Sequence, residues 1–376
     1  MKSSGLNTLC VHAAHTPDAT SGAIAEPIVL ATTFERDADG GYARGYQYSR
    51  EGTPNRTALE SCLAALEGGS GAAAFASGLA ANMAVLELLG AGERLVASRE
   101  AYYGSVRQFV AVARQRGAVL ELVDFGDPAA VKAALAQRTR LVWVETPSNP
   151  LLKITDLELA AALGHAAGAL VVCDNTFATP VCQRPFRFGA DLIVHSGTKY
   201  LGGHSDVLSG AVVVREDAQL LERLRAWQRM AGTGLAPFDC WLLRRSIATL
   251  ALRVRAQCQG ALEVARFLET HPAVERVFYP GLESHPGHAV ARAQMPGGFG
   301  AGLSMCIAGD AARAMQVAAR TRLLARATSL GGVESLIEHR ASVEGPGSRT
   351  PQNLLRLSIG IEEPQDLVED LRQALA

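Results

Sequence analysis

The sequence predicts an α/β protein with a mostly parallel, seven-stranded sheet covered by helices on both faces, followed by a smaller C-terminal α+β domain. Short continuous apolar runs alternate with helical patterns, which is typical of strands that are buried on both faces. From about Trp241 this alternation gives way to long amphipathic stretches. The seven runs are AAAF at 72–75, RLVAS at 94–98, VLELV at 119–123, LVWVE at 141–145, ALVVCD at 169–174, DLIVHS at 191–196 and GAVVV at 210–214.

Three successive parts of the chain are expected. Residues 1–48 lack sustained periodicity and predict an extended arm, whereas residues 49–243 hold all seven runs and predict the α/β domain. Residues 244–376 predict the α+β domain. Its expected elements are a long helical stretch that ends at His271-Pro272, a strand in LSMCIA, a helix near 310–320 and a final helix from Pro364.

Composition narrows the class of protein. The 376 residues are 48% hydrophobic and 19% charged, with a net charge of −1, so there is no positive excess for nucleic acid or an anionic membrane. No stretch approaches the roughly 18 apolar residues of a membrane span, and the first residues lack the apolar core of a signal peptide. The seven cysteines are scattered and form no C-x-x-C pair, which favours free thiols over disulfides or a metal site. We therefore expect a cytoplasmic protein without a metal.

Lysine is rare in this chain. Among 36 basic residues the lysines are Lys2, Lys132, Lys153 and Lys199, and all the others are arginine. Because a surface cation is nearly always arginine here, a lysine inside the fold calls for a chemical explanation.

Polar residues follow several of the predicted strands, at the edge of the sheet where ligands of such folds bind. Asp174 ends one run, Ser196 ends another and is followed by Lys199, and Ser77–Gly78 opens a helix. Taken singly, each has an ordinary interpretation: the aspartate can cap a turn, the lysine can be solvated, and Ser77 can cap the helix. Their occurrence together, in a chain poor in lysine, makes a common site the better hypothesis.

This set of side chains suits pyridoxal phosphate (PLP). A desolvated lysine amine can lose its proton and form a Schiff base, which arginine cannot do. A protonated pyridine nitrogen needs a buried carboxylate opposite it, and Asp174 supplies one. A phosphate group needs backbone N–H groups at a helix start together with hydroxyls, which Ser77–Gly78, Ser196 and Thr198 supply. The residues therefore indicate a PLP site built around Lys199.

Longer segments resemble the Cys/Met-metabolism (trans-sulfuration) family of PLP-dependent enzymes, in particular cystathionine γ-lyase and cystathionine γ-synthase. The resemblance is collinear from about residue 8 to the C-terminus, and its most specific part is the combination of DNTF with S-x-TKYxxGHSD. It implies PLP fold type I, the aspartate-aminotransferase-like fold. The matching segments are PIVLATTF, YQYSR, FASGLAANMAVL, ETPSNPLLKITDL, VVCDNTFATPV, GADLIVHSGTKYLGGHSDVLSG, TSLGGVESLIEHRA and LLRLSIGIE.

The resemblance also implies a role for each matching site residue. Catalysis would fall to Lys199, which would carry the Schiff base, and to Tyr102, which would stack on the cofactor ring. The ring nitrogen of PLP would face Asp174, and Asn149 would also contact the cofactor. The phosphate group of PLP would be bound by Ser77, Gly78, Leu79, Ser196 and Thr198. Tyr48 and Arg50 of a neighbouring subunit would complete the cofactor site. The substrate would contact Asn149, Ser329 and Arg356 at its α-carboxylate, Arg107 at a distal acidic group, and Thr328.

The activity that the resemblance implies is γ-elimination or γ-replacement on cystathionine or O-acylhomoserine-type amino acids. The turn in TSLGGVESLIEHRA is more similar to that of γ-lyases and γ-synthases than to that of β-lyases, where aromatic residues are expected. Gln47 and Thr328 stand where many of these enzymes have acids, so we expect a weaker preference for cystathionine itself. The alternatives are a cystathionine β-lyase, a methionine γ-lyase, an O-acetylhomoserine sulfhydrylase, an aminotransferase and a non-catalytic relative.

The expected partners follow from the same resemblance. Because Tyr48 and Arg50 would reach a neighbour's active site, the chain is expected to form a homodimer or homotetramer whose sites are shared between subunits. The other partners would be PLP and a small amino-acid substrate, with neither nucleic acid nor a membrane.

Overall fold

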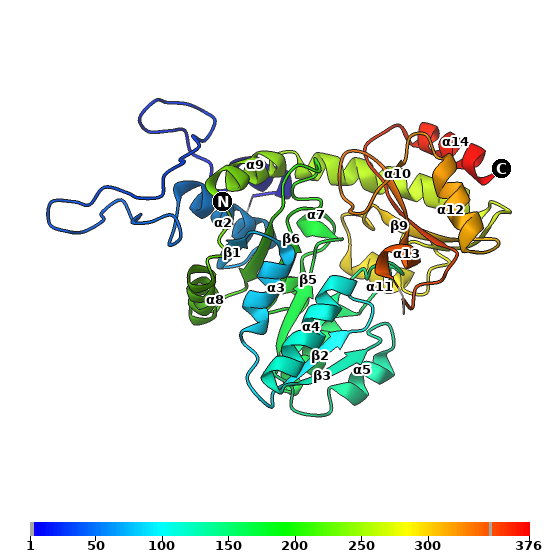
Figure 1. Ribbon diagram of the computed structural model, residues 1–376, viewed down its shortest axis with the longest axis horizontal. Helices are drawn as coiled ribbons and strands as arrows, with labels where there is room; N and C mark the ends of the chain where they lie inside the picture. Colours follow the sequence, from blue (N-terminus) through cyan, green and yellow to red (C-terminus); the bar gives the residue numbers. More distant parts are fainter. Residues whose placement is uncertain (1–3, 346–347) are drawn as a thin grey trace.

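The computed structural model describes residues 4–345 and 348–376. Figure 1 shows a large α/β body, a smaller C-terminal domain beside it, and an N-terminal segment that loops away from both. The long helix α10 (Leu250–Glu269) runs from the large body along the C-terminal domain.

The large body contains the predicted seven-stranded sheet, in the order β1-β7-β6-β5-β4-β2-β3. The strand β7 pairs antiparallel with both β1 and β6, and the other pairs are parallel, so the prediction of a mostly parallel sheet is confirmed. Each strand matches its predicted run to within one residue at either end. The strands are β1 Gly71–Phe75, β2 Arg94–Ser98, β3 Val119–Val123, β4 Leu141–Glu145, β5 Leu170–Asp174, β6 Leu192–Ser196 and β7 Gly210–Val214.

Both faces of this sheet are buried, which explains why its strands read as continuous apolar runs. In β4, Leu141 and Trp143 join the core on one face, and Val142 and Val144 join the core on the other. The first face is covered by α3, α4 and α8, whose residues share that core. The opposite face is covered by α5 and α6 near β4, and by α2 and α9 near β1 and β7.

Local capping signals set the ends of many helices. Thr53 accepts a hydrogen bond from the Arg56 N–H at the start of α2, with Pro54 in the first turn, and Gly68 ends the helix in the left-handed conformation. The helices of the large body are α2 Pro54–Glu67, α3 Gly78–Leu86, α4 Tyr103–Arg116, α5 Pro128–Ala134, α6 Leu157–Ala166, α7 Thr179–Cys182, the 3₁₀ helix Pro185–Phe188, α8 Ala218–Ala231 and α9 Pro237–Ile247.

The C-terminal domain has a five-stranded sheet in the order β10-β11-β12-β9-β8. Only β9 was predicted as a strand. The strands β10 and β11 are short, β8 is partly exposed and contains two charged residues, and β12 carries a buried arginine among its apolar residues. The predicted helices near 310–320 and from Pro364 are confirmed. The elements are β8 Val274–Phe278, α11 His288–Gln294, β9 Gly302–Ile307, α12 Ala311–Arg320, β10 Ala325–Arg326, β11 Leu336–His339, α13 Arg340–Glu344, β12 Leu354–Ser358 and α14 Pro364–Leu375.

The N-terminal segment forms less of the core than the rest. It contains one helix that the sequence analysis did not predict, α1 (Leu6–His12), and an isolated bridge between Thr33 and Tyr48. Apolar side chains such as Ile24 and Leu30 are 71% and 74% exposed. Over the described part of the chain, no helix has both the length and the apolar character needed to cross a bilayer.

Candidate active site

The carboxyl ends of four strands of the large sheet converge on one cavity of about 450 Å³. Its walls come from the segments after β1, β4, β5 and β6, from α4, and from the C-terminal domain. Most of the predicted site residues line it: Ser77, Gly78, Leu79, Tyr102, Asn149, Asp174, Ser196, Thr198, Lys199, Thr328, Ser329 and Arg356.

Lys199 follows β6, is partly buried and lines this cavity. Its Nζ donates a hydrogen bond to Ser329 Oγ at 2.7 Å. Burial, reinforced by the positive charge of Arg356, lowers the pKa of Lys199 to about 8. A substantial part of this amine is therefore unprotonated slightly above neutral pH, as a nucleophile or a base requires.

A strained turn brings Ser329 to the lysine. Ser329 has a φ of +85°, which is costly for a residue other than glycine, and Gly331 follows with a φ of +82°. A Cβ on Gly331 would lie 2.6 Å from the backbone N of Tyr200, so only glycine allows this close approach. The Ser-Leu-Gly-Gly turn is therefore packed directly against the backbone that carries Lys199.

Two carboxyl groups lie side by side in the cavity. Asp174 and Glu145 are register partners on β5 and β4. Burial, together with the Asp174 charge, raises the pKa of Glu145 well above its ordinary value, and its Oε2 accepts a hydrogen bond from Tyr102 N at 2.7 Å. Burial also raises the pKa of Asp174, although hydrogen bonds from Thr176 and the nearby His195 oppose the shift. The arrangement favours one charged carboxylate, on Asp174, beside a neutral Glu145.

A buried polar network lies behind Asp174. Nε2 of His195 lies 2.6 Å from Oε1 of Glu67, and their side chains are 2% and 1% exposed. Asn175 Nδ2 donates to the same Glu67 oxygen at 2.9 Å. The sequence analysis had no signal for this network, because Glu67 is more than 100 residues from both Asn175 and His195 in the sequence.

The start of α3 forms a cradle for an anion. Ser77 caps the helix by accepting from Ala80 N at 3.1 Å, and the first-turn N–H groups of Gly78 and Leu79 have no acceptor within the helix. A Cβ on Gly78 would lie 3.1 Å from the Cβ of Ser196, so the helix start approaches the end of β6 closely. Free N–H groups at the positive end of a helix, next to a serine hydroxyl, are a common phosphate site.

Arg356 lies on β12 and reaches into the cavity from the C-terminal domain. Its Nη1 donates to Asn149 Oδ1 at 3.2 Å and its Nη2 to Ser329 O at 2.6 Å, and it forms a buried ion pair with Glu338. Its buried Nε has no partner among the described residues. The guanidinium is thus held in place at the wall of the cavity by Asn149, Ser329 and Glu338.

Three predicted site residues lie elsewhere in this single chain. Arg107 is exposed on α4 and does not line the cavity. Arg50 forms an ion pair with Glu51 at 3.0 Å and lies over the ring of Tyr48, on the N-terminal segment. Conversely, Glu145 and Arg340 line the cavity although the sequence analysis did not select them.

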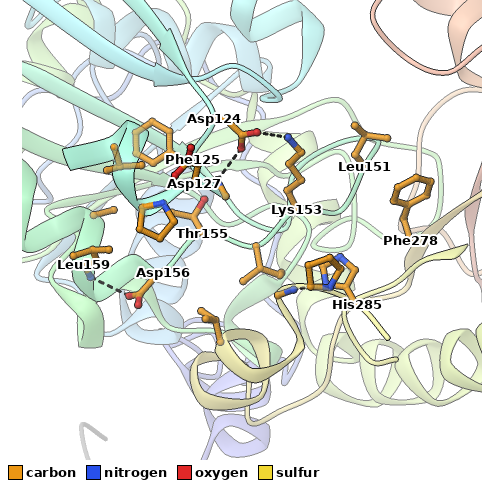
Figure 2. Close-up of a pocket in the computed structure, with 18 of the residues that line it drawn as sticks. Asp124, Phe125, Asp127, Leu151, Lys153, Thr155, Asp156, Leu159, Phe278 and His285 are labelled. Carbon is orange, nitrogen blue, oxygen red and sulfur yellow. Dashed lines mark hydrogen bonds and ion pairs between the residues drawn. The ribbon is translucent and has the colours of Figure 1, made fainter. Parts of the chain in front are cut away.

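Figure 2 shows a larger groove of about 610 Å³ outside this site, lined by residues of both domains. Lys153 lies in it and donates to Asp124 at 2.5 Å and to Glu100 at 3.0 Å. Burial lowers the pKa of Lys153, but hydrogen bonds to these two carboxylates outweigh that effect and raise the value overall. The lysine in the larger cavity is therefore a structural cation and is unsuited to act as a base.

The smaller cavity fits PLP. Asp174 has no salt-bridge partner in the described parts of the chain, so it can face a pyridinium nitrogen. Lys199 offers a buried amine of lowered pKa, Tyr102 offers an aromatic face, and the start of α3 offers the phosphate cradle. These groups line one cavity, as the cofactor requires.

Comparisons with known proteins agree with this arrangement. The family model of the Cys/Met metabolism PLP-dependent enzymes matches residues 7–376. A cystathionine gamma-synthase from Mycobacterium bovis is 46% identical over 378 residues, which cover 99% of this chain and 97% of the relative. A cystathionine beta-lyase from Coxiella burnetii is 43% identical over 383 residues, which cover 100% of this chain and 98% of the relative.

A solved structure of cystathionine gamma synthase from Xanthomonas oryzae, in complex with cystathionine, has a TM-score of 0.95 and 43% identity to this chain. The match covers 99% of this chain and 98% of that one, and it confirms the predicted PLP fold type I. The family match over nearly the whole length, together with the cavity around Lys199, leads to one conclusion: the chain belongs to the Cys/Met-metabolism family of PLP-dependent enzymes.

Proposed function

We propose that this enzyme catalyses γ-elimination or γ-replacement on cystathionine or O-acylhomoserine-type amino acids. The observation that carries the proposal is the Lys199 amine, which shares its cavity with Arg356 and has a pKa lowered to about 8 by burial. A base of that pKa works near neutral pH, where it is partly deprotonated and still accepts a proton readily.

The side chains divide the work as follows. PLP, when bound, supplies an electron sink for charge that develops beside the amino-bearing carbon. Arg356 lines the cavity, and its guanidinium binds the substrate's α-carboxylate and so restricts the orientation of the amino acid. Lys199 Nζ removes the proton from Cα, and Ser329 Oγ, at 2.7 Å, holds the amine in the cavity.

Chemistry at Cγ makes a further demand on the base. Loss of a group from Cβ needs one proton removal, at Cα, whereas loss from Cγ needs a second one, at Cβ. In the described parts of the chain, Ser329 Oγ is the only hydrogen-bond partner of Lys199 Nζ. An amine held by one contact can serve both carbons in turn.

The second candidate is β-elimination, as in cystathionine β-lyases. The segment that would carry aromatic residues in such an enzyme contributes Thr328, Ser329 and Leu330 to the cavity. The absence of an aromatic side chain among these three residues favours γ chemistry.

Product analysis tests the proposal. The enzyme is incubated with L-cystathionine and, separately, with O-acetyl-L-homoserine, without an added thiol, and the oxo acid is identified. We expect 2-oxobutanoate, and we expect its formation to be at least about 100-fold slower in the Lys199→Ala variant. Pyruvate from cystathionine, with no 2-oxobutanoate from either substrate, would replace the γ assignment by the β-lyase one.

We further propose that the enzyme works as a homodimer or homotetramer in which Tyr48 and Arg50 complete the neighbour's phosphate site. Both lie on a segment with little core of its own, and Arg50 is half-exposed in the single chain. Arg50→Ala should weaken PLP binding about 10- to 100-fold, because it removes a charge-assisted hydrogen bond. Arg44→Ala, an exposed arm arginine paired with Glu35, is the matched control. A fully active monomer in light scattering would contradict the assembly.

A cytoplasmic location is proposed from the cysteines. All seven are free and buried, and even Cys182 and Cys258, whose sulfur atoms lie 3.6 Å apart, form no disulfide. Free thiols of this kind are typical of a reducing compartment. Fractionation of the native cells, with detection of the protein, would test the location.

A further inference from the structure

We propose that Cys182 and Cys258 form a reversible disulfide when a peroxide oxidises the protein, and that this bond slows turnover. Cys182 ends α7, and Cys258 lies near the middle of α10, 76 residues away in the sequence. Helix α7 lies next to α10, the long helix that runs from the large body along the C-terminal domain (Figure 1). The disulfide would therefore join an element of the large body to the helix that leads into the C-terminal domain.

The first argument is the proximity of the two thiols. Their sulfur atoms lie 3.6 Å apart and share a hydrogen bond. Among the hydrogen bonds of the described residues, this is the only one that joins two cysteines. A disulfide needs about 2.05 Å between its sulfur atoms, so an approach of about 1.5 Å is sufficient for the bond to form.

The second argument is the thin cover over the pair. The loop 296–300 passes over it, and a Cβ on Gly298 would lie 3.0 Å from Sγ of Cys258 and 3.7 Å from Sγ of Cys182. Gly298 is partly exposed, and its neighbour Gly297 is exposed. Glycine backbone without a side chain therefore separates the thiols from solvent. A small oxidant such as hydrogen peroxide has only a short path to the pair.

The third argument is the difference between the two thiols. Cys258 is 9% exposed and Cys182 only 1%. A hydrogen bond from the Cys182 thiol lowers the pKa of Cys258 although burial opposes the shift, and a hydrogen bond from Gly300 N–H adds to the lowering. Because the thiolate is the reactive form, Cys258 is the thiol that attacks the peroxide, and Cys182 is the one that resolves the product.

The oxidation balances with hydrogen peroxide as the oxidant. Sulfur of Cys258 attacks one peroxide oxygen, so that an S–O bond forms and the O–O bond breaks; the departing hydroxide takes the Cys258 proton and becomes water. Sulfur of Cys182 then attacks the Cys258 sulfur, the S–S bond forms, and the S–O bond breaks. The second hydroxide takes the Cys182 proton, so the thiols lose two electrons in total and the peroxide becomes two water molecules. Thiol–disulfide exchange with a reductant reverses the bond.

The pair is connected to the part of the cavity wall that belongs to the C-terminal domain. Gln257 precedes Cys258 on α10, and its Nε2 donates to Gly332 O at 2.7 Å. Gly332 belongs to the turn whose Ser329 Oγ accepts a hydrogen bond from Lys199 Nζ. A displacement of α10 at Cys258 is therefore passed on to the hydrogen-bond partner of the Lys199 amine.

The pair is also connected to the wall that belongs to the large body. Helix α7 begins shortly after Asp174 and Phe177, which both line the cavity. The approach of the two sulfur atoms draws α7 and α10 together, and with them the segments that form the two walls. Because a displacement of about 1 Å can lower the rate of an enzyme about 100-fold, we expect the disulfide to slow turnover about 10- to 100-fold.

Mass spectrometry of the peroxide-treated, PLP-loaded enzyme tests the site. We expect the intact protein to lose two hydrogen atoms and to regain them in dithiothreitol. Tryptic digestion should give a peptide pair joined through Cys258 and Cys182, and fragmentation distinguishes Cys182 from Cys173 on the same peptide. Cys306, 7% exposed on β9, is the matched control, and Cys306→Ser should form the same bond. Oxidation that leaves Cys182 and Cys258 unlinked would overturn the inference.

Turnover and PLP absorbance test the effect of the bond. The peroxide is removed by desalting, and 2-oxobutanoate formation is measured before and after dithiothreitol. The oxidised wild type should be about 10- to 100-fold slower and should recover, whereas Cys258→Ser, which lacks the attacking thiol, should keep its rate after peroxide. Thermal melting checks that the variant is folded. An equal loss in Cys258→Ser, or an unchanged rate in the fully linked wild type, would overturn the effect.

Two of these measurements do not depend on the proposed function. The mass of the linked peptides needs no substrate, and neither does the absorption band of bound PLP, which should change on oxidation and return in dithiothreitol. If neither cystathionine nor O-acetyl-L-homoserine reacts but both signals appear, the proposed function fails and the disulfide stands. If the substrates react and no linked peptide forms, the disulfide fails and the proposed function stands.

Discussion

Lys199 and Lys153 lie in two different cavities of this protein and are held in opposite ways. Lys199 has one neutral hydrogen-bond partner, Ser329, and burial lowers its pKa to about 8. Lys153 contacts two carboxylates, and their hydrogen bonds raise its pKa despite the opposing effect of burial. The same type of side chain is thus suited to act as a base in one cavity and as a structural cation in the other.

The comparison shows that cavity size is a poor guide to the active site in this fold. The groove around Lys153, shown in Figure 2, measures about 610 Å³, and the cavity around Lys199 about 450 Å³. In the groove the lysine's charge is already neutralised, and His285, whose pKa is lowered to about 4 by burial, stays neutral. The smaller cavity instead holds a lysine and a buried aspartate without mutual pairing, which a cofactor can bind.

The largest expected effect tests the two lysines directly. Lys199→Ala should lower turnover by about 10²- to 10⁴-fold, because it removes the base, whereas Lys153→Ala should change turnover less than about threefold. The rate of 2-oxobutanoate formation measures both variants. Borohydride treatment of the loaded wild type should also attach PLP to the peptide that contains Lys199. A loss of turnover in Lys153→Ala as large as that in Lys199→Ala would contradict the different roles assigned to the two lysines.

The next largest effect is expected on PLP affinity, when an aspartate of either cavity is replaced. Asp174→Asn should raise the Kd for PLP about 10- to 100-fold, because a charged hydrogen-bond partner of the cofactor is lost. Asp124→Asn is the matched control, since Asp124 pairs with Lys153 in the groove. Titration of PLP into each PLP-free variant measures the Kd. Equal PLP affinity in both variants would contradict the role assigned to Asp174.

The lowered pKa of Lys199 also predicts a pH-dependent cost to the PLP-free protein. Its value falls from an ordinary 10.5 to about 8, so between these pH values the unfolded chain binds more protons than the folded one. The free energy of unfolding should therefore rise with pH across this window. Below pH 8 the charged lysine lowers it by up to about 3 kcal/mol.

Lys199→Met removes this cost. Urea unfolding of the PLP-free variant at pH 7 should show a gain of up to about 3 kcal/mol over the wild type, and the gain should shrink toward pH 10.5. A gain that is the same at both pH values would point to a packing effect of methionine instead.

The smallest expected effect is a loss of stability in Lys153→Met, where Lys199→Met gains stability. Lys153→Met should lower the free energy of unfolding by about 1 kcal/mol at pH 7, because it removes a partly exposed ion pair with Asp124 and Glu100. The pKa of Asp124 is lowered by its hydrogen bond to Lys153 in spite of burial. The pair therefore stabilises above the ordinary value of 3.8 and is lost as the pH falls through the lowered pKa. Urea unfolding at pH 7 and pH 3 should show this difference shrink in acid.

Much of the large domain could be predicted from the sequence, and less of the C-terminal one. The seven strands are buried on both faces, so each reads as a continuous apolar run. The strands β10 and β11 span two and four residues, and β12 contains the buried Arg356, so periodicity gives little signal there. The helix α1 was missed because its seven residues bury only Leu9 and Cys10.

By itself, the sequence determined the sheet and the polar residues at its strand ends, because strand order along a parallel α/β chain places Asp174 and Lys199 at the same edge. Only the tertiary structure shows how Lys199 is activated. The lowered pKa of Lys199 depends on burial and on the charge of Arg356, which is itself held by Asn149, 207 residues away in the sequence. Burial and neighbouring charge set a pKa, and both are properties of the folded arrangement.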